Sequence, residues 1–271
     1  MPRPLRSLFV LLAVILMTGC HPATKSRGLL DRMLSPGSLK VGIATDAPPL
    51  AYTKEGKPGG LEVQFAVGLA ESLARKLVVV ELPRADLAEA LQSGKIDILM
   101  AGMTVAEAHA YRLATSNPYL ISGQIALVHL DDFKLLGTGP ANLTGKNVRI
   151  GVVGDSSGDT LIRSLKPKGT VNRFSSASEA VQALIADTID AFVFDLPANA
   201  YYASLHVDKG LTPGVAPLTR EPLVWAVRPD DDNLRKSANA YLAALEKSGE
   251  LQKMLERAIP FYRNTAYSPK Q

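Results

Sequence analysis

The sequence predicts an α/β fold made of two similar lobes, and three observations support this prediction. From Leu39 onward, short β-like runs alternate with helical runs, which is typical of α/β proteins. The alternation restarts at Val148. Finally, Ala90–Asp97 and Ala183–Asp190 both carry Ala-Leu followed by Ile-Asp at the same spacing, 93 residues apart. Such an internal repeat is expected of two lobes with the same local architecture.

The elements of the first half follow from hydrophobic periodicity and from turn residues. Apolar residues at helical spacing continue to Leu77, and Gly94 ends a second helix. The expected elements are a strand at Leu39–Ala44, a helix at Glu62–Leu77, a strand at Val78–Leu82, a helix at Asp86–Ser93 and a buried strand at Ile96–Ala101.

The second half repeats this pattern and adds two helices. Ser176 and Glu179 form a capping box, and Pro197 suits the first turn of a helix, where an N–H is dispensable. The expected elements are strands at Val148–Val153, Val171–Phe174 and Ala191–Phe194, and helices at Asp159–Leu165, Ser176–Ala186 and from Pro197. The C-terminal helices, Asn233–Ser248 and Glu250–Ala258, are expected to pack back on the first lobe.

Ligands of open α/β sheets bind outside the carboxyl ends of the strands. Those ends are Gly102–Thr104 in the first lobe and Asp195 in the second. The chain is expected to cross near Leu127–Leu130 and to return near Leu218–Val227, so that both ends line one cleft. Two crossings suit a hinge that closes on a ligand. We expect residues 37–127 and 219–271 in the first lobe and 128–218 in the second.

The N-terminus has the pattern of an export signal. Arg3 and Arg6 precede the apolar stretch Leu8–Met17, whose ten residues rise only about 15 Å as a helix, too short for a bilayer core of about 30 Å. Two small residues then lead to Cys20, the only cysteine in the chain, in a pattern that resembles a bacterial lipobox with a diacylated cysteine. Residues 1–20 are therefore expected to be a lipoprotein signal peptide and residues 21–36 a tether.

Composition excludes several classes of function. The formal net charge is +4, and loss of the two arginines of the signal would leave +2, too mild a charge to favour nucleic acid. The four histidines lack metal-ligand spacing; they are His21, His109, His129 and His206. Outside the signal no apolar run reaches transmembrane length, so the body is expected to be soluble. We expect no cofactor, no metal and no nucleic-acid partner.

Several segments follow one another in a recognisable order: Val41–Asp46, Gly60–Val63, Ala90–Asp97, Ala101–Thr104, Ser116–Tyr119, Gly145-Lys146, Asp195–Pro197 and Ser248–Leu251. In this order and spacing they resemble the family 3 extracytoplasmic solute-binding proteins of amino-acid importers. The resemblance covers residues 38–260. It implies a two-lobed periplasmic-binding-protein fold of type II with two hinge crossings.

The resemblance also implies a ligand clamp. In that family one lobe holds the ligand α-carboxylate with an arginine, a threonine hydroxyl and backbone N–H groups, while an aspartate of the other lobe holds the α-amino group. A pair of threonines before a helix start adds donors for an anionic oxygen. The positions of this chain that match the clamp and the edge of its cleft are Asp46, Gly102, Thr104, Ser156, Ser157 and Asp195.

Three positions depart from the family pattern. His109 stands where the arginine is expected, and Ala47 and Arg84 stand where aromatic residues usually enclose the ligand side chain. Tyr52 is the nearest aromatic residue. Because a histidine cannot replace a bidentate guanidinium, Arg84 or Arg112 is a candidate for the missing cation. An amino-acid-like zwitterion, another small polar or anionic ligand, and a pocket without a tight ligand all stay open.

Each candidate residue also has a purely structural interpretation. Asp195 is placed to cap the helix at Pro197, and Ser156 and Ser157 are placed to cap the helix that follows them. Thr104 could simply end a strand, and His109 could lie on a helix surface. Arg84 could be a solvated loop charge, and Tyr52 could serve ordinary packing. Their expected convergence on one cleft is what favours a binding site.

A second resemblance suggests a different role. The segments Pro49–Tyr52, Gly56–Pro58, Gly60–Glu62 and Pro222–Val227 also resemble the N-terminal module of membrane-bound lytic murein transglycosylases. In those proteins the module senses ligands, and a separate C-terminal domain cuts peptidoglycan. Since the sequence ends at Gln271, we expect no such catalytic domain, and a cell-envelope sensor or regulator is an alternative function.

Catalysis is the least favoured interpretation. Some dehydratases of prephenate or arogenate share the family fold and need an acidic proton donor, for which Glu62, Asp155 and Asp195 are the candidates. No sequence pattern pairs two of these acids, and neither Ser156 nor Ser157 lies in a Gly-x-Ser-x-Gly motif. We therefore expect a monomeric binding lipoprotein of the periplasm or cell surface. It would close over a small polar, amino-acid-like solute and serve an ABC permease or an envelope sensor.

Overall fold

The computed structural model describes residues 37–264. The expected signal peptide, Cys20 and the tether lie outside these described residues. Within them, no helix is both long enough and apolar enough to span a bilayer.

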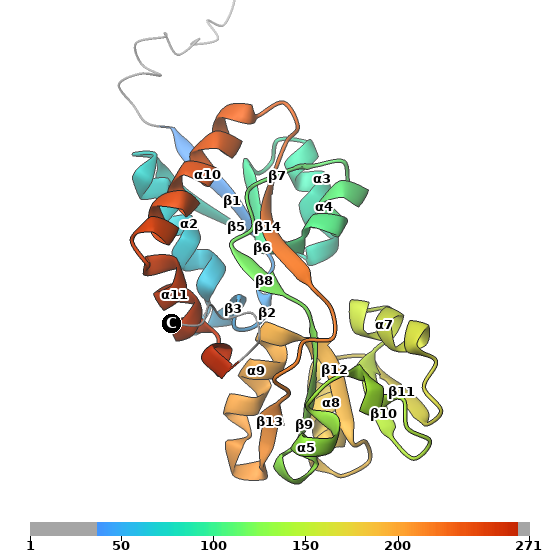
Figure 1. Ribbon diagram of the computed structural model, residues 1–271. Coiled ribbons are helices and arrows are strands. Elements are labelled where there is room, and N and C mark those ends of the chain that lie inside the picture. Colours follow the sequence, from blue (N-terminus) through green and yellow to red (C-terminus); the bar gives the residue numbers. More distant parts are fainter. Residues whose placement is uncertain (1–36, 265–271) are drawn as a thin grey trace, which may run out of the picture. The chain divides into compact units, whose positions relative to one another are not determined.

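The first sheet has six strands in the order β5-β1-β6-β14-β7, with β8 also paired to β14 (Figure 1). Its parallel strands are β1 (Ser38–Ile43), β5 (Lys76–Glu81) and β6 (Ile98–Thr104). Its antiparallel strands are β14 (Glu221–Val227), β7 (Ala114–Thr115) and β8 (Leu120–Ser122). A small antiparallel sheet precedes the first helix along the chain and consists of β2 (Asp46–Ala47), β3 (Ala51–Lys54) and β4 (Lys57–Gly59).

The second sheet has five strands in the order β11-β10-β12-β9-β13. Its parallel strands are β10 (Arg149–Val153), β11 (Thr170–Phe174) and β12 (Ala191–Asp195), and its antiparallel strands are β9 (Gln124–His129) and β13 (Leu211–Pro213). The order β11-β10-β12-β9 repeats the order β5-β1-β6-β14 of the first sheet. The prediction of two similar α/β lobes is therefore confirmed.

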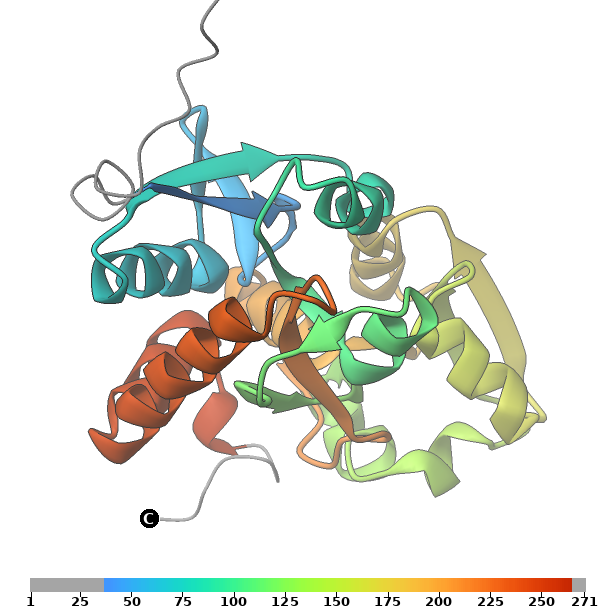
Figure 2. The same cartoon turned by 90° about the horizontal axis from the view of Figure 1, so that it is seen from above.

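Helices cover both faces of each sheet, because successive strand residues are apolar and point alternately to the two sides. On one face of the first sheet, α2 (Leu61–Ser72), α10 (Asp232–Lys247) and α11 (Glu250–Ala258) pack around Phe65 and Trp225, and α2 and α10 lie side by side in Figure 2. On its other face lie α3 (Leu87–Gln92) and α4 (Val105–Ala110). The second sheet is covered by α5 (Phe133–Leu136), α6 (Pro140–Leu143) and α7 (Ser157–Leu165) on one face and by α8 (Ala177–Ile185) and α9 (Leu196–Leu205) on the other.

The repeated Ile-Asp pairs have the same structural role in both lobes. The carboxylate of Asp97 accepts from the N–H of Lys40 at the start of β1, at 2.9 Å. The carboxylate of Asp190 accepts from the N–H of Arg149 at the start of β10, at 2.7 Å. In each lobe the isoleucine before the aspartate fills the space beside a glycine. A Cβ added at Gly42 would overlap Cδ1 of Ile96, and a Cβ added at Gly151 would overlap Cδ1 of Ile189. The internal repeat in the sequence thus marks equivalent places in two lobes.

The strand expected at Ile96–Ala101 is β6 (Ile98–Thr104), and two further expectations need larger corrections. The helix expected to reach Leu77 ends at Ser72, because Ala74 adopts a left-handed conformation with φ 50° and the chain turns into β5. The crossing expected at Leu127–Leu130 lies inside the second sheet, because β9 pairs with β12 from Gln124 onward. The first crossing therefore lies at Gly123, between β8 and β9.

The two crossing segments lie side by side. The Gln124 N–H donates to Thr219 Oγ1 at 2.8 Å, and the Leu218 N–H donates to the Gln124 carbonyl at 2.7 Å. Gly123 allows this approach, because a Cβ there would overlap the carbonyl of Thr219. The lobe division predicted at 127/128 falls inside β9, and the division at 218/219 stays a prediction.

Candidate functional site

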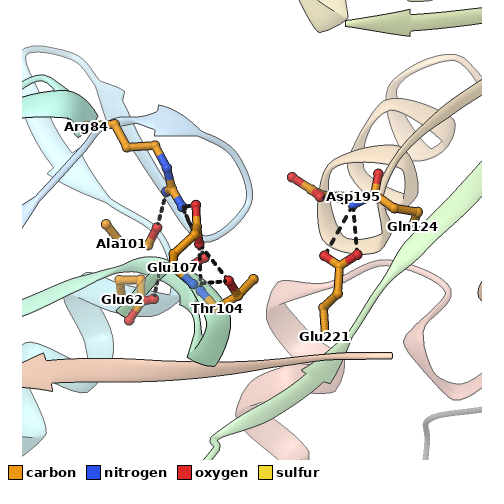
Figure 3. Close-up of polar contacts among 9 residues, drawn as sticks. Glu62, Arg84, Ala101, Thr104, Glu107, Gln124, Asp195 and Glu221 are labelled. Carbon is orange, nitrogen blue, oxygen red and sulfur yellow. Dashed lines mark hydrogen bonds and ion pairs between the residues drawn. The ribbon is translucent and has the colours of Figure 1, made fainter. Parts of the chain in front are cut away.

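Charged and polar side chains gather at the carboxyl ends of β6 and β12. Figure 3 shows one group on the side of the first sheet and a second group, with Asp195, on the side of the second sheet. Two charges from the first group, Arg84 and Glu107, act electrostatically on Asp195. The strand ends that the sequence assigns to one cleft are therefore close enough to interact.

Thr104 ends β6 and caps helix α4. Its hydroxyl accepts from the N–H of Glu107 at 3.1 Å, and the carboxylate of Glu107 accepts from the N–H of Thr104 at 2.7 Å, which completes a capping box. The Thr104 hydroxyl also donates to Glu107 Oε2 at 3.0 Å. Thr104 is thus a structural cap in addition to a candidate ligand residue.

Arg84 is exposed, but the protein holds its guanidinium in place. It lies in a short 3₁₀ helix, η1 (Arg84–Asp86), and its guanidinium donates to the Ala101 carbonyl at 2.5 Å and to Glu107 Oε1 at 3.1 Å. Desolvation alone would raise the pKa of Glu107, but the charge of Arg84 and the hydrogen bonds from Thr104 and Arg84 outweigh it and lower this pKa. Glu107 is therefore an anion held against Arg84 at the end of β6.

Gly102 is held by a buried carboxylate. The Gly102 N–H donates to Glu62 Oε1 at 2.7 Å, the Tyr119 hydroxyl donates to the same oxygen at 2.5 Å, and Trp225 Nε1 donates to Oε2 at 3.1 Å. Burial raises the pKa of Glu62, and the three donors partly offset this effect. Because Gly102 has φ 64°, a residue with a side chain would be strained there. Glu62 and Gly102 together fix the backbone of the site.

Asp195 ends β12 and is held by an amide of the hinge. Gln124 Nε2 donates to Asp195 Oδ1 at 2.6 Å and to Glu221 Oε2 at 3.3 Å. Gln124 begins β9, directly after the crossing at Gly123, and Glu221 begins β14, directly after the returning segment. Although Asp195 occupies the N-cap position of α9, its side chain makes no capping hydrogen bond. The structural interpretation of Asp195 as a helix cap is therefore wrong.

Asp195 is open to solvent and yet surrounded by protein. Desolvation raises its pKa, the charges of Glu221 and Glu107 add to this effect, and the hydrogen bond from Gln124 and the charge of Arg84 oppose it. Water reaches this carboxylate, but the surrounding protein atoms and neighbouring acids still raise its pKa. This is where a ligand would find a partly dehydrated anion.

The serine pair lies at the start of α7. Ser156 Oγ accepts from the N–H of Asp159 at 3.2 Å and donates to the Val153 carbonyl at 2.7 Å, so its capping interpretation is confirmed. Ser157 is the exposed first residue of the helix. The next residue is Gly158, where a Cβ would stand 3.0 Å from Gln124 Oε1. The start of α7 therefore adjoins the amide that holds Asp195.

The remaining candidates differ in position. Asp46 is an exposed residue of β2 whose charge acts on Arg84, and its pairing partner in β3 is the half-buried Tyr52. His109 is exposed on the last turn of α4, which fits its structural interpretation as a helix-surface residue. Arg84, and not His109, is thus the cation that the structure brings to the end of β6.

Sequence reasoning missed three polar residues: Glu107, Gln124 and Glu221. The Thr-x-x-Glu pattern of a capping box was present at Thr104 and Glu107 and could have identified the first. Gln124 and Glu221 had no such local signal, because their meeting depends on how the crossing strands pair.

The carboxylates at the ends of β6 and β12 can hold a cation or accept hydrogen bonds from a ligand. Within residues 37–264, no group of three or more His, Cys, Asp or Glu side chains is arranged to hold a metal ion. Of the acids considered for catalysis, Glu62 is buried and accepts three hydrogen bonds, whereas Asp195 is accessible. The third, Asp155, is exposed and donates its N–H to Asp159 at 3.3 Å.

Comparison with known proteins gives a consistent result. Residues 39–260 match the model of bacterial extracellular solute-binding proteins, family 3. The L-cystine-binding protein TcyJ of Escherichia coli is 27% identical over 93% of this chain and 94% of its own length. The cyclohexadienyl dehydratase of Pseudomonas aeruginosa is 25% identical over 98% and 99%. Membrane-bound lytic murein transglycosylase F of Desulfosudis oleivorans is 27% identical, and the match covers 95% of this chain but 57% of that protein.

Solved structures share the fold. The ancestral cationic amino acid solute binding protein AncCDT-1 superposes with a TM-score of 0.75 at 30% identity, covering 82% of this chain and 96% of that one. A putative ABC-transporter binding component from Wolinella succinogenes, complexed with lysine, has a TM-score of 0.72 at 27% identity, with coverage of 82% and 96%. The prediction of a two-lobed periplasmic-binding fold is confirmed.

Proposed function

Because the chain belongs to family 3 of the bacterial extracellular solute-binding proteins, we propose that it binds a small, amine-bearing, amino-acid-like solute between its two lobes and delivers it to an ABC permease. Closure of the lobes about the two crossing segments would enclose the solute. The name of another relative, the ABC transporter glutamine-binding protein GlnH of Bacillus subtilis, supports the transport part of this proposal.

One observation carries the proposal: Asp195 ends β12 opposite the charged groups at the end of β6, and the charges of Arg84 and Glu107 act on it (Figure 3). An ammonium group placed against Asp195 would form a charge-assisted hydrogen bond to a partly dehydrated carboxylate. The rest of the solute would then reach Thr104, Gly102 and Arg84 of the other lobe. A ligand that contacts both lobes favours the closed state by its extra affinity for that state.

The charge of the site favours a solute with more than one cationic group. Asp46, Glu107 and Asp195 all act on the single guanidinium of Arg84, and Glu221 acts on Asp195. Anions therefore outnumber the cation among these residues. The structural relatives named above include a cationic amino-acid binder and a lysine complex, which supports the same ligand class.

A thermal-shift screen tests the proposal. The purified chain would be heated with cationic, neutral and acidic amino acids, organic acids and muropeptides. A ligand at 100 times its dissociation constant should stabilise the folded state by about 2.7 kcal/mol. We expect stabilisation by basic amino acids. A response to muropeptides alone would instead support the envelope regulator suggested by the transglycosylase resemblance, and a flat screen would contradict solute binding.

We also propose export and lipid anchoring, with diacylated Cys20 holding the protein at the surface of a membrane. The support is the pattern of charged, apolar and small residues before Cys20. Fractionation of cells that express the chain should place it with membranes, and Cys20→Ser should release it into the soluble periplasmic or culture fraction. Unchanged membrane association in Cys20→Ser would contradict the anchor.

A dehydratase activity is the second candidate, and one observation favours it. The chain resembles a cyclohexadienyl dehydratase over 98% of its length, and the accessible Asp195 has a raised pKa, as a proton donor requires. Incubation with prephenate or arogenate, followed by chromatography of the products, tests this candidate. Asp195→Asn is the control. Product formation that depends on Asp195 would establish catalysis, and its absence would leave the binding proposal alone.

A further inference from the structure

The donors at the end of β6 already hold a carboxylate of the protein itself. Glu107 Oε2 accepts from the Thr104 N–H at 2.7 Å and from the Thr104 hydroxyl at 3.0 Å. Arg84 Nη2 lies 3.1 Å from Glu107 Oε1 and 3.3 Å from Oε2. A backbone N–H, a hydroxyl and a guanidinium are a complete donor set for one carboxylate. Glu107 therefore already uses donors that would otherwise be free for a ligand carboxylate.

A second carboxylate at this place would meet unfavourable charges. Arg84 is shared among Glu107, Asp195 and Asp46, and its other contacts are donations to the Ala101 and Gly102 carbonyls. An incoming ligand carboxylate would have to displace Glu107 or share Arg84 with it. An ammonium or guanidinium group meets the opposite situation, because the carboxylates of Asp195 and Glu221 flank the amide of Gln124.

We infer that the solute is recognised through its cationic groups and needs no carboxylate, so that organic amines and guanidines bind as well as the corresponding α-amino acids. This inference builds on the proposed function, since it concerns the same site between the lobes. It narrows the ligand class from amino acids to small organic cations.

Matched ligand pairs test the inference, because each pair differs only by the α-carboxylate: lysine and cadaverine, arginine and agmatine, ornithine and putrescine. Dissociation constants would be measured by calorimetric titration of the full chain. We expect each amine to bind within threefold of its amino acid or more tightly. An amino acid that binds more than threefold tighter than its amine would overturn the inference and leave the proposed solute-binding function intact. If none of the six compounds binds, both fail.

Glu107→Gln tests the cause. Loss of the internal anion frees Arg84 to bind a ligand carboxylate. The dissociation constant of the amine divided by that of the amino acid should therefore rise about tenfold, which corresponds to one hydrogen bond to a charged group. The matched control is Glu179→Gln in the second lobe, where the Glu179 carboxylate accepts from the N–H and hydroxyl of Ser175 and not, as the expected capping box requires, from the N–H of Ser176. The control should leave the ratio unchanged. Equal ratios in Glu107→Gln and the wild type would overturn the role assigned to Glu107.

Discussion

Gln124 Nε2 donates to Asp195 Oδ1 at 2.6 Å. This hydrogen bond joins the end of β12 to the start of its neighbour β9 in the second sheet. The same amide nitrogen lies 3.3 Å from Glu221, the first residue of the returning strand. The other end of this amide, Oε1, is buried and accepts no hydrogen bond from the residues that the structure describes. The two carboxylates therefore orient the Gln124 amide. This amide connects Asp195, the proposed cation site, with the two segments that cross between the lobes.

The affinity for a cationic solute should depend on pH through Asp195. Desolvation raises the pKa of this carboxyl above the ordinary value of about 3.9. Since a cation binds the ionised form, affinity should fall as the pH is lowered through this raised pKa, at a higher pH than for an ordinary aspartate. Calorimetric titration of a basic amino acid from pH 7.5 down to about pH 3.5, below the ordinary aspartate pKa of about 3.9, measures this. Constant affinity over that range would show that Asp195 does not contact the ligand cation.

The same raised pKa predicts the stability of Asp195→Asn. At pH values between the pKa of Asp195 in the unfolded chain and its raised pKa in the folded protein, the folded state binds more protons than the unfolded state. The contribution of Asp195 to stability therefore falls as the pH rises through this range. At pH 7 the ligand-free variant should therefore be at least as stable as the wild type, because Asn carries no charge to desolvate. Thermal unfolding of both proteins without ligand checks this. A clear drop in melting temperature would mean that Asp195 serves the fold.

Glu62 should be essential to the first lobe. In Glu62→Ala, the N–H of Gly102, the hydroxyl of Tyr119 and Nε1 of Trp225 lose their acceptor in a buried place. Each unsatisfied buried donor costs about 1–3 kcal/mol, so the free energy of unfolding should fall by at least about 3 kcal/mol. Glu62→Gln keeps the shape and one acceptor oxygen and should cost less than half as much. Urea denaturation compares the variants, and equally small losses for both would refute this role.

The equivalent glycines of the two lobes should respond alike to substitution. In Gly42→Ala the new methyl overlaps Cδ1 of Ile96, and in Gly151→Ala it overlaps Cδ1 of Ile189. Overpacking of this kind costs about 1–3 kcal/mol. Adding Ile96→Val or Ile189→Val removes the overlapping atom and should recover part of the loss.

A double-mutant cycle in each lobe, measured by chemical denaturation, gives the coupling energy of each pair. Coupling in one lobe and additivity in the other would contradict the equivalence of the two sites.

Much of the fold could be predicted because its strands are short, apolar and separated by turn residues. The repeated Ile-Asp pairs identified equivalent places because the same hydrogen bond is formed in both lobes. The end of α2 could not be predicted, since apolar periodicity continues past Ala74, where a left-handed turn ends the helix. The crossing was placed too late, since an apolar run such as β9 does not indicate which sheet will bury it.

The site was predictable only in part. Thr104 and Asp195 could be placed at strand ends, since strand ends follow from the pattern of buried runs. The pairing of Arg84 with Glu107 joins residues 23 positions apart and depends on how η1 packs beside β6. The meeting of Gln124, Asp195 and Glu221 depends on strand register, which a single sequence does not specify.

The most direct test of the account is a calorimetric titration of lysine or arginine into three proteins: the wild type, Asp195→Asn and Asp208→Asn. Asp208 is the control, since it is an exposed acid of the second lobe whose loss removes the same charge outside the site. We predict that Asp195→Asn binds at least tenfold more weakly, as expected for loss of a charge-assisted hydrogen bond, and that Asp208→Asn binds like the wild type. Equal affinity in all three proteins would contradict a solute site built on Asp195.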